Sequence, residues 1–177
     1  MLELKKGVDI LAHTGGVATI DQAKTILEQK LDAANLEKLA PIKNEEALIK
    51  IANAITLCEP DDVFIDTGSE ADTQWVREYA LRTGEEKKLA KEGHTIHFDL
   101  PQEQARLVNQ TFYIVNEGEN LSALAKSTPR SEALEYVRTN MRGIMKGKSM
   151  LIGFFSRGPA GAEAAIPAIE ISSSGYV

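Results

Sequence analysis

Met150-Leu151-Ile152-Gly153-Phe154-Phe155 is the stretch of this sequence that decides its fold. Six uncharged residues that follow Gly147 have the length and composition of a strand buried on both faces. A second apolar run lies at 166–171, and the segments 63–65 and 112–115 are predicted to be two further short strands. We therefore expect a sheet that contains a fully buried strand at 150–155.

Helical patterns precede and separate these strands. The apolar spacing over 21–40 predicts one helix with Asp21 as its N-cap, and Pro41 would stop it. A second helix is predicted over 45–57, where Asn44 would be the N-cap and the two glutamates of the first turn suit the helix dipole.

Two more helices are predicted further along the chain. Ser69 would cap the first, with Asp72 three residues later in a variant of the capping box and Gly84 at the end. Thr128 and Pro129 would open the second as N-cap and first helical residue. Its apolar positions would be Leu134, Val137, Met141 and Met145, with Gly147 ending the helix.

The alternation of helices and strands predicts an α/β fold, with a mixed, partly parallel sheet flanked by helices in a single domain. We expect this domain to span 1–177, with 1–43 as a helical lead-in of unassigned role. Gly175-Tyr176-Val177 follow a strand directly and do not form a polar tail, which indicates a truncated chain.

Composition excludes some classes of function. The 177 residues carry a net charge of −6, which argues against nucleic-acid binding because phosphate contacts need a basic face. Cys58 is the only cysteine, as expected in a reducing compartment, and its default role is packing. The sequence shows neither a signal peptide nor a bilayer-length apolar stretch. We expect a cytoplasmic protein without a membrane partner.

Two motifs suggest chemistry that their context does not favour. Gly147-Lys148-Ser149 looks like the end of a phosphate-binding loop, but it lies where a helix ends and a strand begins, the reverse of that motif. His94, His97 and Asp99 are close in sequence, although a metal site needs three or four convergent ligands, so structural hydrogen bonding is the favoured interpretation.

Three further segments are candidates for a binding site. The turn Asp66-Thr67-Gly68-Ser69 lies between a strand and a helix, where free N–H groups can hold an anion, although capping explains the same residues. The loop 158–161 follows the buried strand and is either a site wall or an ordinary turn. Arg106 offers a rigid guanidinium fork for a carboxylate or phosphate, against the simpler alternative of a surface arginine.

The order of several motifs resembles that in the N-terminal domain of GTP-dependent phosphoenolpyruvate carboxykinase. Residues 93–98 are more similar to the archaeal branch of this family. The matching residues are Asp66-Thr67-Gly68-Ser69-Glu70, Ala105-Arg106, Met145-Lys146-Gly147-Lys148-Ser149-Met150, Phe155-Ser156-Arg157-Gly158-Pro159-Ala160-Gly161, Ile169-Glu170-Ile171 and Tyr176-Val177. The resemblance covers the chain from about Leu57 to its end. Arg157 stands where the family usually has methionine and Ser173 where it has aspartate, which leaves a divergent function open.

This resemblance implies an enzyme part. The parent would be a lyase of gluconeogenesis that converts oxaloacetate and GTP to phosphoenolpyruvate, carbon dioxide and GDP. Arg106 matches the arginine that grips the substrate anion in the family. GTP and manganese or magnesium would be bound by a C-terminal nucleotide-binding domain of a monomeric parent, so this chain would hold no cofactor, metal or catalytic residue and would be inactive alone.

Two other functions stay open on the sequence. One is a non-catalytic binding module that holds a dicarboxylate or phosphoenolpyruvate through Arg106. The other is a structural or interaction domain in which the α/β core persists without the site.

Overall fold

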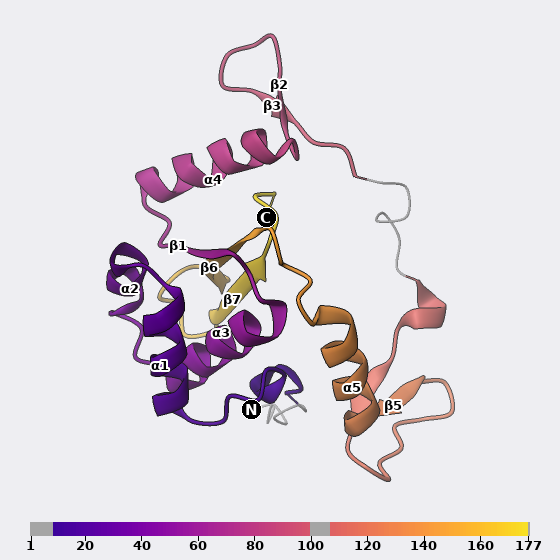
Figure 1. Ribbon diagram of the computed structural model, residues 1–177. Coiled ribbons are helices and arrows are strands. Elements are labelled where there is room, and N and C mark those ends of the chain that lie inside the picture. The colour runs from indigo at the N-terminus through magenta and orange to yellow at the C-terminus, as the bar shows by residue number, and fades with distance from the viewer. Residues whose placement is uncertain (1–8, 100–106, 177) are drawn as a thin grey trace.

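The run at 150–155 lies in the central strand of the main sheet. The computed structural model describes residues 9–99 and 107–176. In it, β6 (Ser149–Arg157) pairs in parallel with β1 (Asp62–Asp66) and antiparallel with β7 (Ile166–Ser172), so the sheet order is β1-β6-β7 (Figure 1). The predicted α/β fold with a mixed, partly parallel sheet is confirmed.

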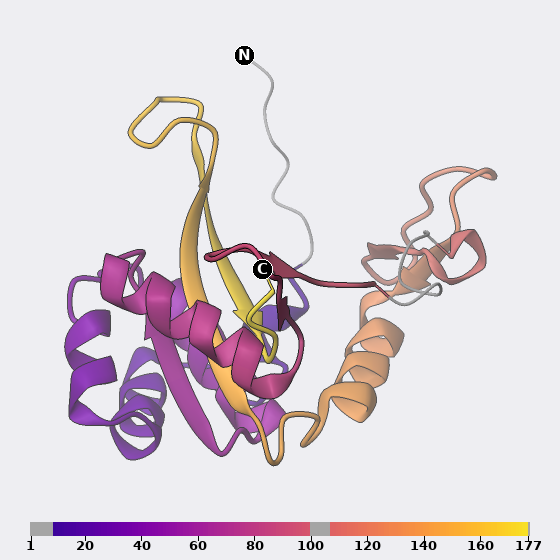
Figure 2. The same ribbon diagram turned by 90° about the horizontal axis from the view of Figure 1, so that it is seen from above.

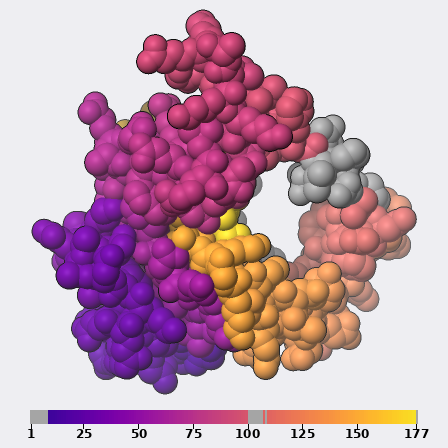
Figure 3. All heavy atoms as spheres, turned by 45° about the horizontal axis from the view of Figure 1, so that its top comes forward, coloured from indigo at the N-terminus to yellow at the C-terminus, as the bar shows by residue number. Residues whose placement is uncertain are grey.

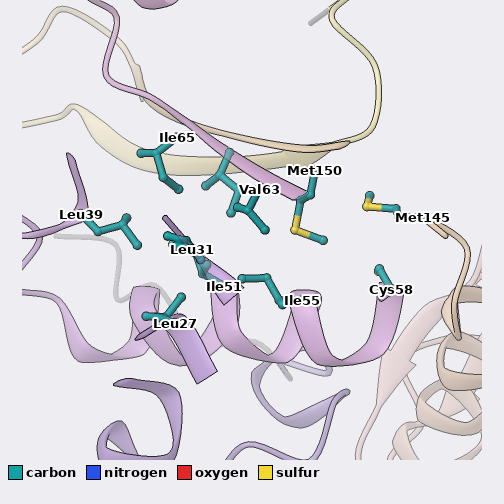
Figure 4. Packing of buried hydrophobic residues seen from close by; sticks show 11 residues of the cluster. Leu27, Leu31, Leu39, Ile51, Ile55, Cys58, Val63, Ile65, Met145 and Met150 are labelled. Carbon is teal, nitrogen blue, oxygen red and sulfur yellow. The ribbon is translucent and has the colours of Figure 1, made fainter. Parts of the chain in front are cut away.

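One face of this sheet packs on α3 (Glu45–Cys58). Because side chains alternate along a strand, Val63, Ile65, Met150 and Ile152 all point to that face. Figure 4 shows Val63, Ile65 and Met150 opposite three residues of the helix, Ile51, Ile55 and Cys58, each of which is at most 1% exposed. Asn44 caps α3 as predicted, with its side chain accepting from the Ala47 N–H.

The segment predicted as one helix over 21–40 forms two. These are α1 (Ile20–Lys30), capped by Thr19 in a capping box with Gln22, and α2 (Ala33–Leu39), capped by Asp32. Asp21 is therefore not the N-cap, because the Thr19 hydroxyl makes the capping hydrogen bond one residue before the helix begins. Both helices contribute leucines to the core.

Asn53 of α3 ties the N-terminal loop to the core. Its Oδ1 accepts from the N–H groups of Gly15 and Val17, both at 2.9 Å, and its Nδ2 lies 2.8 Å from the carbonyl oxygens of Ala12 and Val17. The loop passes so close that a Cβ at Gly15 would lie 2.4 Å from the Asn53 carbonyl oxygen. The loop, which carries the 3-10 turn η1 (Leu11–His13), is thus held by one buried amide.

The other face of the sheet is partly covered by α4 (Glu70–Thr83). Phe64 of β1 stacks on Trp75 with ring centroids 3.7 Å apart. Ser69 caps this helix and Gly84 ends it at φ 81°, both as predicted. Side chains of α2 cover the outer edge of β1, since Asn35 accepts from the Ile65 N–H and Lys38 donates to the Ile65 carbonyl.

The segment between α4 and β6 makes two small sheets. β2 (Lys87–Lys88) pairs antiparallel with β3 (Thr95–Ile96), while β4 (Tyr113–Val115) pairs in parallel with β5 (Ser127–Pro129). The 3-10 turn η3 (Val108–Gln110) precedes β4, and α5 (Arg130–Met141) follows β5.

The predicted limits of α5 are wrong at both ends. Thr128 belongs to β5, and Pro129 takes the N-cap position without a side-chain cap. The helix ends at Met141, before Met145 and Gly147. The chain turns there because its N–H groups bind the last carbonyl groups of α3, which have no partner within that helix. The Gly143 N–H donates to the Leu57 carbonyl, and the Met145 N–H donates to the Cys58 carbonyl.

The strand β6 is less buried than its sequence predicts. It is buried from Met150 to Gly153, but Phe155 is 47% exposed, because β6 and β7 continue as a hairpin beyond the helices (Figure 2). The chain reverses at 158–165, at the tip of this hairpin.

Asn53 offers a test of the packing of the N-terminal loop. We expect Asn53→Ala to lower the free energy of unfolding by about 3 kcal/mol or more, because several buried backbone groups lose their partner at about 1–3 kcal/mol each. Chemical denaturation measures this change. Asn140→Ala, at an exposed asparagine of α5, is the control and should change stability by less than about 0.5 kcal/mol. Equal effects of the two variants would contradict the account.

Candidate functional site

A hollow of about 360 Å³ lies between the sheet and α4. It is on the face opposite the α3 core, where the alternate residues of β1, β6 and β7 project. Its walls come from all three strands of the sheet, from α4, and from the turn that follows β7. The lining residues are Asp66, Thr73, Val76, Arg77, Glu86, Leu151, Gly153, Phe155, Glu170, Ser172, Ser174, Gly175 and Tyr176.

This hollow brings together three motif segments that are far apart in sequence. Asp66 is the last residue of β1, Phe155 comes from β6, and the residues from Glu170 to Tyr176 come from the last strand and its turn. The parallel pairing of β1 with β6 brings Asp66 opposite Gly153, and the antiparallel pairing of β6 with β7 brings Gly153 opposite Glu170. The register of the sheet therefore assembles the site.

Gly153 shapes the floor of the hollow. A Cβ at this position would lie 2.6 Å from the Phe155 ring, so the ring occupies the space above the glycine. Any side chain at 153 would push the ring out of its place.

The turn 173–176 is held against α4 and the β2 segment. The Glu85 carboxylate accepts from the Gly175 N–H at 2.6 Å and from the Ser174 hydroxyl at 3.1 Å, and the Tyr79 hydroxyl donates to the Ser173 carbonyl. A Cβ at Gly175 would lie 3.1 Å from the Val76 carbonyl oxygen, so glycine permits this close approach. Glu85 therefore has a structural role, although the charged run at 85–88 in which it lies is typical of a solvated surface.

His97 fixes the last described residue of that turn. Its ring stacks on Tyr176 at 3.9 Å between centroids, its Nδ1 lies 2.9 Å from the Glu85 carbonyl oxygen, and its Nε2 lies 3.1 Å from the Asp99 carboxylate. The Glu85 carbonyl, with a contribution from Asp99, raises the pKa of His97 against the effect of burial. His94 instead meets the Glu92 carbonyl, and the described residues hold no cluster suited to a metal ion. The structural interpretation of these histidines is confirmed.

The turn after β1 is closed by its own hydrogen bonds. The Thr67 N–H and hydroxyl donate to the Asp72 carboxylate, the Gly68 N–H donates to Asp66, and the Asp72 N–H donates to Ser69. Capping and turn contacts therefore use the N–H groups of Thr67, Gly68 and Asp72, as expected if the residues serve as a helix cap.

Asp72 is the buried centre of this turn. Burial alone would raise the pKa of its carboxyl group, but hydrogen bonds from Lys38, at 2.6 Å, and from Thr67 outweigh burial and lower the pKa to about 2. The pair joins α2 to α4 across the end of β1, and so fixes the wall that carries Asp66.

The described lining of the hollow is acidic. Asp66, Glu86 and Glu170 face one cation, Arg77. Sequence reasoning missed Arg77, although Thr73, Val76, Arg77 and Ala80 follow the spacing of one helix face. A dianionic ligand would need more positive charge than these residues supply.

The remaining candidates fall into three groups. Arg106 lies outside the described residues, so its role stays a prediction. Gly147-Lys148-Ser149 lies where a turn, rather than the predicted helix end, runs into β6, and the Gly147 N–H donates to Asp61. Cys58 is buried in the core, where burial raises the pKa of its thiol, and its packing role is confirmed.

Arg157 lies on β6 two residues beyond Phe155, on the same face of the strand as the hollow. It is exposed on the hairpin opposite Ile166. Of the two residues that depart from the family pattern, this one is therefore exposed on the hairpin and outside the lining of the hollow.

Comparison with known proteins identifies the class of this domain. Residues 50–177 match the phosphoenolpyruvate carboxykinase N-terminal domain. The chain belongs to the phosphoenolpyruvate carboxykinase family, which confirms the resemblance inferred from its motifs.

Individual relatives agree with this assignment. The chain is 38% identical over 158 residues to the phosphoenolpyruvate carboxykinase [GTP] of Pyrococcus furiosus, and 36% identical over 142 residues to that of Saccharolobus solfataricus. These matches cover 89% and 80% of the chain, but 25% and 23% of the relatives. A cytosolic [GTP] carboxykinase of Gallus gallus is 28% identical. The chain thus spans about a quarter of the length of the curated relatives that it matches.

One further finding concerns membranes. Within residues 9–99 and 107–176, no helix is long and apolar enough to cross a bilayer.

The Asp72 network predicts a loss of stability in acid. A carboxyl group whose pKa is about 2 when folded and about 4 when unfolded stabilises the fold above pH 4, by about 2–3 kcal/mol, and this contribution is lost as the pH falls from 4 to 2. In Asp72→Asn we expect the unfolding free energy to lose most of this dependence. Denaturation at several pH values tests it. Asp62→Asn, at an exposed carboxylate of β1, is the control, and a pH profile of Asp72→Asn like that of the parent chain would count against the network.

The raised pKa of His97 leads us to expect a second dependence of stability on pH, opposite in direction to that of Asp72. Because its pKa is raised, the protonated ring stabilises the 173–176 turn below the ordinary histidine pKa of about 6.5, and this contribution is lost as the pH rises through the raised value. An NMR titration should give a pKa for His97 above 6.5, and a lower one in Asp99→Asn. A value at or below 6.5 would refute the contacts described for this ring.

Proposed function

We propose that this chain is the N-terminal, substrate-binding part of a carboxykinase that converts oxaloacetate and GTP to phosphoenolpyruvate, carbon dioxide and GDP. The observation that carries the proposal is the match of residues 50–177 to the carboxykinase N-terminal domain, in a chain that spans about a quarter of the GTP-dependent relatives. The parent would be a cytoplasmic, monomeric lyase of gluconeogenesis. Its substrate-binding domain would span 1–177, including the lead-in 1–43.

The reaction explains why the site needs a strong cation. Loss of carbon dioxide from oxaloacetate leaves an enolate, whose oxygen then takes the γ-phosphoryl group of GTP. Negative charge is present on the substrate carboxylates and develops on the enolate and phosphoryl oxygens, so cations must face them. The described lining has one guanidinium against three carboxylates. We assign the missing substrate-facing cation to Arg106.

Arg106 would hold the substrate rather than react with it. A guanidinium can bind a carboxylate through two parallel hydrogen bonds, which fixes both position and orientation. Holding a substrate in a reactive pose can supply several kcal/mol of barrier reduction. This role matches the resemblance of Ala105-Arg106 to the family motif.

The rest of the chemistry would belong to the C-terminal nucleotide-binding domain of the parent. GTP and manganese or magnesium would bind there, with the metal neutralising charge on the phosphoryl group and the enolate. On this division the 177 residues alone bind oxaloacetate or phosphoenolpyruvate and do not turn it over. The alternative of a standalone binding module for the same anions draws no support from relatives that are themselves carboxykinases.

A chimera tests the assignment of Arg106. Residues 1–177 replace the matching quarter of the Pyrococcus furiosus relative, and carboxykinase kinetics are compared with and without Arg106→Lys. Lysine keeps the charge but loses the fork, so we expect KM for oxaloacetate to rise about tenfold or more, as for the loss of a charged hydrogen bond.

The matched control is Arg142→Lys, at an exposed arginine that does not line the hollow, and it should leave KM unchanged. Unchanged kinetics in Arg106→Lys would refute the role of Arg106. Turnover by residues 1–177 without the remainder would refute the proposed division of labour.

A further inference from the structure

The turn after β7 supplies three lining residues of the hollow, Ser174, Gly175 and Tyr176. A carboxylate that lies about 90 residues earlier in the chain holds this turn: Glu85 accepts from the Gly175 N–H at 2.6 Å and from the Ser174 hydroxyl at 3.1 Å. Figures 1 and 3 show the C-terminal residues, in yellow, beside the magenta segment that holds α4. Any change that moves Glu85 or Tyr176 therefore changes this wall of the hollow.

The His97 ring contacts both sides of this connection. It stacks on the Tyr176 ring, with centroids 3.9 Å apart and planes 15° apart, and its Nδ1 lies 2.9 Å from the backbone carbonyl oxygen of Glu85. Its Nε2 lies 3.1 Å from the Asp99 carboxylate. His97 is not among the described lining residues of the hollow. It would therefore act on a ligand there through the residues that it holds.

Both oxygen atoms that face the ring nitrogens are hydrogen-bond acceptors. A neutral imidazole carries one N–H and can donate to either the Glu85 carbonyl or the Asp99 carboxylate, but not to both. The protonated ring carries two N–H groups and can donate to both. As a cation it is also attracted to the face of the Tyr176 ring. These contacts are therefore all satisfied only when His97 is protonated.

The charged groups around the ring favour the same protonated form. In the described part of the chain, the titratable groups that face it are Asp99 on its own segment, Glu85 on the segment after α4, and Tyr176 on the last turn. The hydrogen bond to the Glu85 carbonyl raises the pKa of His97, the two carboxylates add to this effect, and burial opposes it. The ring therefore loses its proton above the ordinary histidine pKa of about 6.5.

We propose that His97 is a positioning residue of the candidate site, whose protonated form holds the turn 173–176 in the place that lets the hollow bind a dicarboxylate. The inference rests on the proposed function and deepens it, since it links the binding of the substrate anion to pH. The positive charge next to Tyr176 acts in the same direction, because the described lining of the hollow has three carboxylates and one guanidinium. Binding should weaken as the pH rises and His97 loses its proton.

Hydrogen exchange followed by NMR tests the positioning role without a ligand. The Gly175 amide donates to Glu85, and we expect its protection factor to fall about three- to tenfold as the pH rises through the titration of His97, as for the loss of one hydrogen bond. His97→Phe keeps a ring for the stack but has no proton to lose, so its protection should not depend on pH. His94→Phe, at a histidine that meets the Glu92 carbonyl outside the hollow, is the matched control and should behave as the parent chain.

Asp99→Asn provides a second variant that keeps the histidine. Removal of the carboxylate lowers the pKa of His97, so the fall in protection of the Gly175 amide should move to lower pH. A protection factor that does not depend on pH in the parent chain, or that depends on pH equally in His97→Phe, would overturn the positioning role.

Binding of oxalate tests the link to the ligand. Oxalate is a dicarboxylate that stays fully ionised from about pH 5.5 to about pH 8.5, on either side of the ordinary histidine pKa, so a change of affinity in this range comes from the protein. We expect the Kd of the chain for oxalate to rise about three- to tenfold over this range, and to stay constant in His97→Phe.

The outcomes separate this inference from the proposed function. Oxalate that binds with the same pH dependence in the parent chain and in His97→Phe would overturn the inference and leave the proposed function in place. If oxalate does not bind at any pH, the proposed substrate-binding role of the chain fails, and the link between His97 and a ligand fails with it. The exchange of the Gly175 amide then decides by itself whether His97 positions the turn.

Discussion

The packing of α3 against one face of the β1–β6 pair is the interaction on which the rest of the structure depends. Ile51 and Ile55 of the helix and Ile65, Met150 and Ile152 of the strands are at most 1% exposed. Other parts of the chain are positioned by the same helix. Asn53 binds the N-terminal loop, and the carbonyl groups of Leu57 and Cys58 receive the turn before β6. Any change that shifts α3 should therefore move the loop, the turn and the sheet together.

The same packing decides where the candidate site lies. Since one face of the sheet is committed to α3, the alternate side chains of β1, β6 and β7 are left to line the hollow beneath α4. Glycine at 153 leaves space for the Phe155 ring, and glycine at 175 lets the final turn approach α4. Glu85 and His97 then hold that turn from the side of the β2 segment.

Much of this fold could be predicted because local signals agreed with the tertiary result. Residue type and spacing predict the strand at 150–155, although not the exposure of its end at Phe155, and they predict the caps at Asn44 and Ser69. The break between α1 and α2 was missed because apolar spacing runs through it, whereas Asp32 caps the second helix. The end of α5 could not be found locally, since it is set by hydrogen bonds to α3, some 85 residues away.

The candidate site, like the fold, could be predicted only in part from the sequence. The order of short motifs identified the family, and the sheet register explains why those motifs meet. Arg77 and Glu85 were missed because their roles depend on the phase of α4 and on a turn about 90 residues later. The described residues leave the charge of the hollow unbalanced, since three carboxylates and one guanidinium cannot by themselves favour a dianion. The proposed role of Arg106 would supply the missing cation.

A titration of phosphoenolpyruvate into the isotopically labelled chain, followed by amide NMR shifts, shows whether the hollow beneath α4 binds the substrate anion. We expect shifts concentrated at Gly153, Phe155 and residues 170–176, together with the Arg106 amide, and their loss in Arg106→Lys. Shifts centred instead on the hollow lined by Arg138 and Arg142, or a response identical in the variant, would contradict this expectation.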